Sequence, residues 1–269
     1  MVEAVPLARY GELIPAGARH ALADREWTAS VMPGGRQVNL CLKLEDARGN
    51  AAVLRVRRGP ALPGADFSRE VLCHRRAAEA GLSPAIRAAD AAEGWIVMDH
   101  VPGSPWTEDT LQGEAALWRL CDRLRRLHAL ETPDLPPVSD LALLRANCDV
   151  LAANGQADAE ALMQRGAELT AQLALMPARP PALCHGDPDV ANFLGEAPTL
   201  IDFEYAQVAD PTYDLALLIT YYPTLDGQLS RLQAAMGLDD GLSKRRLPVQ
   251  LELCRIVGEA WTRTQRLLS

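Results

Sequence analysis

One short segment constrains this chain more than any other. Residues 184–205 read CHGDPDVANFLGEAPTLIDFEY and set carboxylates among residues that favour burial. Such polar side chains usually lie on a surface, because burying an unpaired charge is costly. Here Asp187, Asn192 and Asp202 stand among apolar neighbours such as Phe193. The segment therefore predicts a buried framework that holds carboxylate and amide oxygens in fixed positions.

The local pattern predicts that these oxygens converge. A short apolar strand leads up to Asp187, and Pro188 prevents it from continuing as a regular strand. The residues from Asn192 to Tyr205 alternate around a turn at 195–198, as a hairpin or close strand pair does. This geometry would bring the three polar residues to the same end. Two carboxylates and an amide oxygen suit a hard divalent cation such as Mg²⁺.

Composition limits the class of protein. The chain has 269 residues, of which 48% are hydrophobic and 23% charged, enough for one large domain or two modest ones. The formal net charge is −8 and the basic stretches are short, which argues against nucleic acid as a partner. Because the sequence shows no signal pattern and no long apolar run, we expect a cytoplasmic protein without a membrane partner.

Periodicity predicts two lobes. Residues 38–46 and 52–58 alternate as strands around a turn, and 66–82 reads as a helix capped by Asp66 or Ser68. Residues 94–103 read as a buried strand ending in a Pro-Gly break. Helices are expected after that point, at 108–130, 140–155, 157–176, 214–222 and 249–268. We therefore predict a β-rich lobe over 1–102 and a mainly helical lobe over 103–269.

Phosphoryl transfer requires the parts found in the 184–205 segment. An Asp accepts the proton of the attacking hydroxyl, while an Asn and a second Asp hold the metal ions. Protein kinases place the first two at the spacing Asp-x-x-x-x-Asn, which Asp187 and Asn192 reproduce. An unrelated reading, a turn with local side-chain caps, explains the pair but not the later Asp202.

His185-Gly-Asp187-x-x-x-x-Asn192, followed by Ile201-Asp202-Phe-Glu204-Tyr205, resembles the aminoglycoside phosphotransferase and choline kinase superfamily. The later stretch DPTYDLA, with Asp210 and Asp214, resembles the segment that follows in that superfamily. The resemblance implies an α+β, protein-kinase-like bilobal fold that uses ATP and Mg²⁺. It implies Asp187 as the catalytic residue, and Asn192 and Asp202 as metal ligands.

The resemblance extends upstream and implies the nucleotide site. PGGRQVNLCLKL resembles the hairpin that covers the phosphates, and AVLRV resembles the third strand, where choline-type members often carry Arg. WIVMDHVPG resembles the hinge strand that contacts adenine. Arg55 could instead be an exposed strand cation, and Glu70, its expected ion-pair partner, an ordinary surface carboxylate. The implied nucleotide-binding residues are Gly34, Gly35, Asn39, Arg55, Glu70, Met98, Asp99, His100 and Val101.

The acceptor alcohol is less well defined. Negative charge and aromatic residues favour a small cationic metabolite of choline, ethanolamine or thiamine type, because a quaternary ammonium binds well against ring faces. One departure concerns Tyr221, which stands where choline kinases usually carry an acidic residue. Glu204, Asp189 or Glu259 would have to supply the missing negative charge to a cationic substrate. The implied substrate residues are Asp189, Glu204, Tyr205, Tyr221 and Trp261.

Two supporting roles and three alternatives complete the prediction. We expect Asp214 and His185 to brace the catalytic loop, and His128 to be a core histidine. An aminoglycoside or amino-sugar kinase ranks lower, since no dense acidic run follows Asp240. A catalytically silent nucleotide-binding module and an unrelated metal hydrolase are alternatives of other classes.

Overall fold

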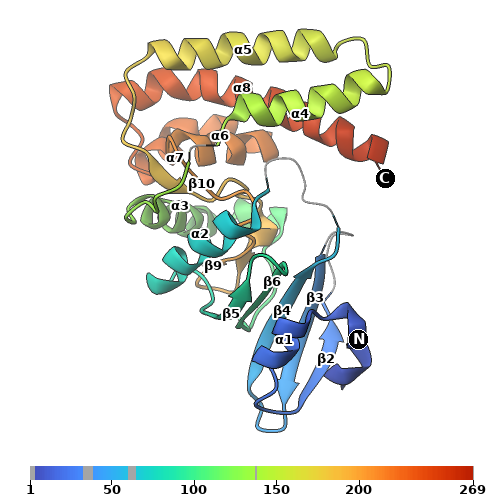
Figure 1. Ribbon diagram of the computed structural model, residues 1–269. Coiled ribbons are helices and arrows are strands. Elements are labelled where there is room, and N and C mark those ends of the chain that lie inside the picture. The colour runs from blue at the N-terminus through green and yellow to red at the C-terminus, as the bar shows by residue number, and fades with distance from the viewer. Residues whose placement is uncertain (1–3, 33–38, 60–64, 137, 269) are drawn as a thin grey trace. The chain divides into compact units, whose positions relative to one another are not determined.

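The computed structural model describes residues 4–32, 39–59, 65–136 and 138–268. The chain divides into two compact units (Figure 1). The first comprises Met1–Ser104 and Leu194–Glu204, and the second comprises Pro105–Phe193 and Tyr205–Ser269. The predicted lobes were continuous in sequence, whereas the first unit also takes up the segment 194–204.

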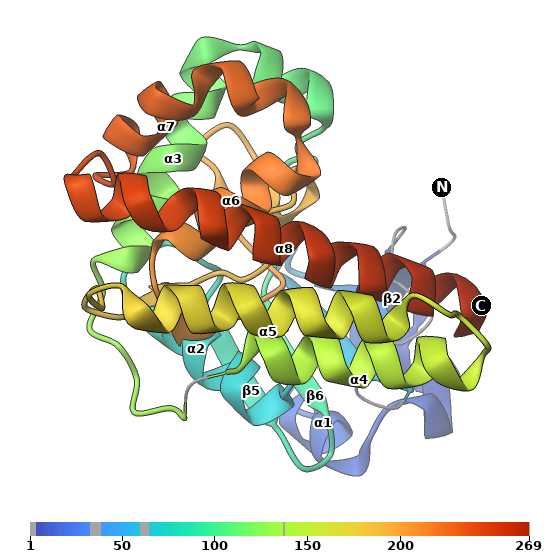
Figure 2. The ribbon, with the colours of Figure 1, turned by 90° about the horizontal axis from the view of Figure 1, so that it is seen from above.

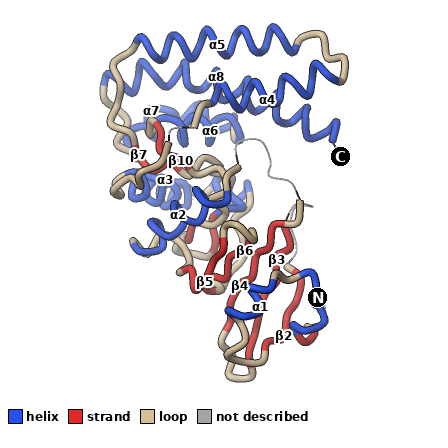
Figure 3. Tube along the Cα trace, in the orientation of Figure 1, coloured by secondary structure: helices blue, strands red, loops and turns tan. Residues whose placement is uncertain are grey.

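The first unit is built on an antiparallel sheet, drawn in red in Figure 3. Within the described residues this sheet has six strands in the order β1-β2-β3-β4-β6-β5. The strands are β1 (Val5–Pro6), β2 (Trp27–Val31), β3 (Asn39–Asp46), β4 (Ala51–Arg57), β5 (Ile86–Asp90) and β6 (Trp95–Asp99). The helical elements of this unit are η1 (Leu7–Leu13), α1 (Ala16–Ala21) and α2 (Phe67–Glu79).

The predicted hairpin is confirmed as β3 and β4. Alternating leucines, among them Leu42, Leu44 and Leu54, are fully buried on one face, as a period-two strand pattern requires. The connecting turn is fixed by Asp46, whose Oδ1 accepts the backbone N–H groups of Arg48 and Asn50 at 2.9 and 2.8 Å. A short, locally satisfied turn therefore sets the strand register.

Helix α2 begins as the sequence predicts. Asp66 is its N-cap, and its carboxylate accepts the backbone N–H of Arg69 at 2.9 Å. Such a cap satisfies one of the free N–H groups at a helix start and contributes about 1 kcal/mol. Cys73 and Ala77 are fully buried, whereas Glu70 is buried without being apolar. Its burial follows from its partner, Arg55, described below.

The second unit is mainly helical. Its helices are α3 (Glu114–His128), α4 (Asp140–Ala153), α5 (Ala159–Leu175), α6 (Thr212–Tyr221), α7 (Leu229–Ala235) and α8 (Gly241–Leu268). Helices α4, α5 and α8 lie side by side and bury a common apolar core that includes Leu151, Leu169 and Leu253 (Figure 2). The 3₁₀ turns are η2 (Glu108–Gln112), η3 (Val190–Asn192) and η4 (Pro223–Gln228).

Short strands frame the segment that opened the sequence analysis. Strand β7 (Ala182–Cys184) pairs antiparallel with β10 (Gln207–Ala209) in the second unit. Strands β8 (Phe193–Leu194) and β9 (Thr199–Leu200) form the expected strand pair around the turn. The α+β class is therefore confirmed, with a sheet-based first unit and a helical second unit.

Two predicted helices have different bounds. The single helix expected at 108–130 is η2 followed by α3, because Gly113 between them has an extended backbone. The last helix was expected from residue 249, yet α8 begins at Gly241. Asp240 explains this early start, since its Oδ1 accepts the N–H groups of Leu242 and Ser243. Within the described residues, none of the helices has the length and apolar character needed to cross a bilayer.

Candidate active site

The loop that follows β7 makes a sharp turn at Gly186. This glycine has a φ of +76°, and a Cβ added to it would lie 2.0 Å from the carbonyl oxygen of Tyr205. A residue with a side chain would be strained in this left-handed conformation and would also collide with the backbone. The position therefore requires glycine, and the sharp turn leads directly into Asp187.

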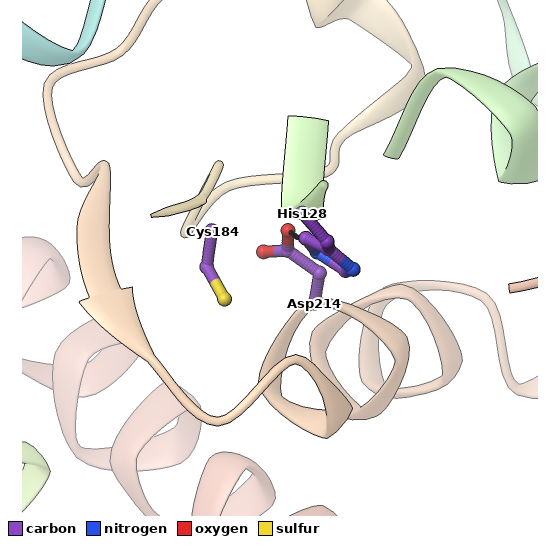
Figure 4. A group of neighbouring side chains, drawn as sticks. All are labelled: His128, Cys184 and Asp214. Atoms are coloured by element: carbon purple, nitrogen blue, oxygen red, sulfur yellow. Dashed lines mark hydrogen bonds and ion pairs between the residues drawn. The ribbon is translucent and has the colours of Figure 1, made fainter. Parts of the chain in front are cut away.

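Asp214, on α6, holds this loop through hydrogen bonds to its backbone. Its two carboxylate oxygens accept the backbone N–H groups of His185 and Gly186, each at 2.9 Å. The same carboxylate is 2.8 Å from Nε2 of His128, at the end of α3 (Figure 4). Burial by itself would raise the pKa of Asp214, but the hydrogen bonds from His128 and the loop lower it below the usual range. Asp214 is thus a buried, ionised brace for the loop.

His128, Cys184 and Asp214 lie close enough to suggest a metal site, with ligand atoms within 4.8 Å of one another. Their chemistry favours a brace instead. A metal-binding cysteine must be a thiolate, whereas burial and the nearby Asp214 carboxylate raise the pKa of Cys184 well above its ordinary value. The Cys184 thiol also faces the carbonyl oxygen of Asp210 at 3.6 Å. Asp214 already accepts hydrogen bonds from the backbone of the loop. The three residues therefore form a support for the loop, not a metal site.

The structure brings Asp187 and Asn192 together. Nδ2 of Asn192 donates to both the carbonyl oxygen and Oδ2 of Asp187, each at 3.0 Å. Each residue is only 8% exposed. Asp189 closes the intervening turn through its Oδ1, which accepts the N–H of Ala191 at 2.9 Å. Both side-chain bonds of Asn192 use its amide nitrogen, so its amide oxygen keeps the chemistry of a hard metal ligand.

Two adjacent tyrosines at the end of α6 also contact this loop. Burial and the charge of the nearby Asp187 carboxylate raise the pKa of Tyr221. The hydroxyl of Tyr222 accepts the backbone N–H of Val190 at 3.0 Å. Burial raises the pKa of Tyr222 to about 12, so its hydroxyl remains neutral. The sequence suggested Tyr222 as a candidate aromatic wall of the acceptor pocket, but its bond to the backbone of Val190 was not predicted.

In the first unit, Arg55 is the centre of an acidic cluster. It is ion-paired with Glu70, and its second terminal nitrogen donates to Oε2 of Glu204 at 3.2 Å. Oδ1 of Asp202 lies 3.4 Å from the guanidinium. Arg55, Glu70 and Glu204 are buried, at 8%, 3% and 7% exposure. Arg55 is therefore not an exposed strand cation, and the expected pair with Glu70 is present.

The charges of this cluster support one another. Burial opposes a charged Arg55, but the carboxylates of Asp202, Glu70 and Glu204 raise its pKa above the ordinary value. Burial raises the pKa of Glu70, and the Arg55 guanidinium opposes that shift. Glu204 was missed as a partner of Arg55, because the two are far apart in sequence and nothing in their local patterns links them.

Asp202 corrects one detail of the prediction. It was expected within a strand, but it follows β9 and has a φ of +63°, a left-handed backbone that is uncommon outside glycine. Its side chain is 36% exposed beside the buried Arg55. Such strained residues persist only where their surroundings hold them in place. The carboxylate is thus partly exposed, with its Oδ1 buried near the Arg55 guanidinium.

The remaining predicted residues have these places. Asn39 begins β3, and Met98 and Asp99 end β6, with His100 and Val101 directly after it. Asp99 is paired with Arg87 at 2.7 Å. Tyr205 and Trp261 are half-buried in the second unit, and Trp261 lies on α8. Gly34 and Gly35 lie outside the described residues.

Known proteins resemble this chain in family and fold. A comparison with curated protein sequences found no match. A choline/ethanolamine kinase family protein from Mesorhizobium loti has a TM-score of 0.70 at 23% identity, covering 89% of this chain and 80% of that chain. Choline kinase LicA from Streptococcus pneumoniae has a TM-score of 0.73 at 15% identity, over 93% and 89%.

A third solved structure, aminoglycoside-3'-phosphotransferase of type VIII, has a TM-score of 0.60 at 22% identity, covering 87% of this chain and 93% of that chain. These likenesses show a shared fold. The model of the phosphotransferase enzyme family, APH, matches residues 33–247, which include the loop of Asp187 and Asn192 and the cluster of Arg55. The chain therefore belongs to the APH phosphotransferase family.

Proposed function

We propose that this phosphotransferase uses ATP and Mg²⁺ to phosphorylate a hydroxyl group of a small cationic metabolite, of choline, ethanolamine or thiamine type. The observation that carries the proposal is the pairing of Asp187 with Asn192, at 3.0 Å, in a loop braced by Asp214. Protein kinases carry out phosphoryl transfer with a carboxylate base and an amide metal ligand at this sequence spacing.

The nucleotide role rests on the first unit. Arg55, held by Glu70, is proposed to contact the nucleotide phosphates, as the basic residue of this strand does in kinases. LicA, one of the proteins of similar fold, has been crystallised in complex with AMP. That complex supports nucleotide use by this chain as well. The glycines at 34 and 35, the residue Asn39 and the stretch 98–101 are proposed to complete the nucleotide site.

The donor chemistry fits Mg²⁺. Asn192 offers an amide oxygen and Asp202 a carboxylate, and both are hard oxygen ligands of the kind this ion takes. We propose these two residues as its protein ligands. When bound, the ion neutralises charge on the phosphates. The strained backbone of Asp202 supports a functional role, because such strain is typical of functional sites.

Asp187 is proposed to act on the acceptor alcohol. The substrate oxygen bonds to the γ-phosphorus, the bond from that phosphorus to the β,γ-bridging oxygen breaks, and ADP leaves with the bridging oxygen. The hydroxyl proton passes to the Asp187 carboxylate. Asn192 holds that carboxylate in place. Most of the rate acceleration is expected from positioning and charge neutralisation.

A coupled assay of ADP release tests the proposal. Purified protein with ATP and Mg²⁺ is screened against choline, ethanolamine, thiamine, amino sugars, homoserine and aminoglycosides. Turnover with one of the cationic metabolites is the expected result. Turnover with aminoglycosides or amino sugars alone would favour a second function, that of an aminoglycoside or amino-sugar kinase. The similar fold of an aminoglycoside phosphotransferase supports this second candidate. Nucleotide-dependent thermal stabilisation without any turnover would indicate a silent binding module.

A further inference from the structure

The guanidinium of Arg55 is held at both of its terminal nitrogens. Nη1 is ion-paired with Glu70 on α2, and Nη2 donates to Oε2 of Glu204 at 3.2 Å. All three side chains are buried. The resemblance in sequence implied the pair with Glu70 but assigned Glu204 to the acceptor alcohol. The structure instead places Glu204 on the second arm of the guanidinium, within the first unit.

Two partners on separate segments fix the orientation of this planar group. The guanidinium is a rigid fork, so a single partner fixes one nitrogen and leaves the plane free to turn about that contact. Glu70 comes from helix α2, whereas Glu204 comes from the segment 194–204. The second contact removes the remaining rotation. The direction in which Arg55 presents its charge is therefore set by the protein itself.

The residues around Glu204 anchor it in turn. Phe203 is fully buried, and its ring stacks on the ring of His74 on α2, with centroids 5.2 Å apart and planes at 16°. The backbone N–H of Leu200 donates to the carbonyl oxygen of Leu82, just after α2, at 2.8 Å. The main chain that carries Glu204 is thus attached to the same helix that carries the first partner of Arg55.

Asp202 is a looser third partner of the same guanidinium. Its Oδ1 lies 3.4 Å from Nη1 of Arg55, and its side chain is 36% exposed, whereas Glu204 is buried. Within the described residues this oxygen accepts no hydrogen bond. A partly exposed ion pair without a hydrogen bond contributes less than a hydrogen-bonded one. Asp202 can therefore leave the guanidinium at lower cost than Glu204.

We propose that Glu204 is a positioning residue, which together with Glu70 orients the Arg55 guanidinium for the nucleotide phosphates and leaves Asp202 available as a metal ligand. This inference rests on the proposed function, because it takes Arg55 as the residue that contacts the phosphates. It places Glu204 in the nucleotide site, where it acts through Arg55, and not on the acceptor alcohol.

Charge and geometry predict opposite results for Glu204→Gln. The substitution removes a negative charge, so an effect of charge alone would tighten the binding of an anionic nucleotide. The positioning role predicts weaker binding instead. An amide holds a guanidinium less firmly than a carboxylate does, and the loosened fork must then be ordered when the nucleotide binds. The sign of the change in affinity therefore separates the two effects.

Isothermal titration calorimetry with a non-hydrolysable ATP analogue measures this change, once with Mg²⁺ and once with excess EDTA. We expect the Kd of Glu204→Gln to rise about three- to tenfold in both conditions, because orienting Arg55 does not depend on the metal. Glu204→Asp keeps the charge and withdraws the carboxylate by one methylene group. It is expected to raise Kd at least about twofold, and it answers the same question if the Gln variant fails to fold.

Two further variants show whether the effect passes through Arg55. In an Arg55→Lys background, Glu204→Gln should change Kd less than about twofold, because an ammonium group has no plane to orient. Glu93→Gln is the matched control in the first unit. Oε2 of Glu93 accepts the N–H groups of Gly17 and the Trp95 indole, each at 3.0 Å. Its loss should leave the affinity for the nucleotide unchanged.

The outcomes separate this inference from the proposed function. Unchanged or tighter binding by the Glu204 variants would overturn the inference, as would an equal loss in the Arg55→Lys background. A loss seen only with Mg²⁺ would overturn it as well, because Glu204 would then act on the metal. In each of these cases the proposed function stands. A wild type that binds no nucleotide in either condition would overturn the proposed function, and the inference with it.

Discussion

Nε2 of His128 lies 2.8 Å from Oδ2 of Asp214, which supports the loop of Asp187. Because hydrogen bonds lower the pKa of Asp214, its carboxylate is the acceptor and the histidine ring is the donor. The same carboxylate also holds the backbone N–H groups of His185 and Gly186. One buried charge thus connects the end of α3, the start of α6 and the loop of Asp187.

Asp214→Asn is therefore expected to destabilise the protein. The amide keeps the shape but turns an N–H group toward donors that need an acceptor. We expect the free energy of unfolding to fall by about 2–4 kcal/mol, as when a buried charged hydrogen-bond partner is lost. Urea denaturation measures this change. The exposed pair of Asp122 with Arg125 provides the control, and Asp122→Asn should change stability by less than about 1 kcal/mol. Equal effects would contradict the bracing role.

Gly186→Ala tests whether the loop needs its left-handed turn. The added Cβ would lie 2.0 Å from the Tyr205 carbonyl oxygen, so the loop must move. We expect a loss of at least about 2 kcal/mol in unfolding free energy, beyond the usual penalty for a left-handed residue, together with loss of turnover. Gly155→Ala is matched, since Gly155 has a φ of +74° and open space around it. Similar losses of stability in both variants would show that the left-handed backbone angle alone causes them, and would contradict the role of the close approach to Tyr205.

Arg55→Met tests the acidic cluster of the first unit. Without the guanidinium, Glu70 and Glu204 would be buried carboxylates without their cation, and unfolding free energy should fall by about 3–5 kcal/mol. The exposed pair of Arg87 and Asp99 offers a control, in which Arg87→Met should cost less than about 1 kcal/mol. The double variant Arg55→Met with Glu70→Met should recover part of the loss. A single variant as stable as the wild type would contradict this account.

Asp140 predicts a pH dependence of stability. Burial raises its pKa from 3.8 to about 6, although Gln250 donates a hydrogen bond to its carboxylate at 3.3 Å. The folded state therefore binds more protons than the unfolded state between these values, and stability falls as pH rises through about 6. The stabilising contribution is fully present only below about pH 4. Asp140→Asn should be more stable than wild type at pH 8, by about 1–3 kcal/mol, and similar at pH 4. A difference that is the same at both pH values would contradict the assignment.

Local patterns predicted much of this fold. Alternating leucines predicted the hairpin of β3 and β4, and a capping aspartate predicted the start of α2, because both depend on neighbours in sequence. The spacing of Asp187 and Asn192 likewise predicted their contact. The partners of Arg55 and Tyr222 are set by packing between distant segments. The bond of Arg55 to Glu204 spans 149 positions, so no local pattern records it.

The central claim is that Asp187 accepts the proton of a hydroxyl as ATP is consumed. The most direct test compares ADP release by wild type and Asp187→Asn with the acceptor found in the screen, while calorimetry follows binding of the ATP analogue with Mg²⁺. The account predicts that the variant binds the nucleotide with near wild-type affinity and loses almost all turnover. Full turnover by Asp187→Asn would contradict it.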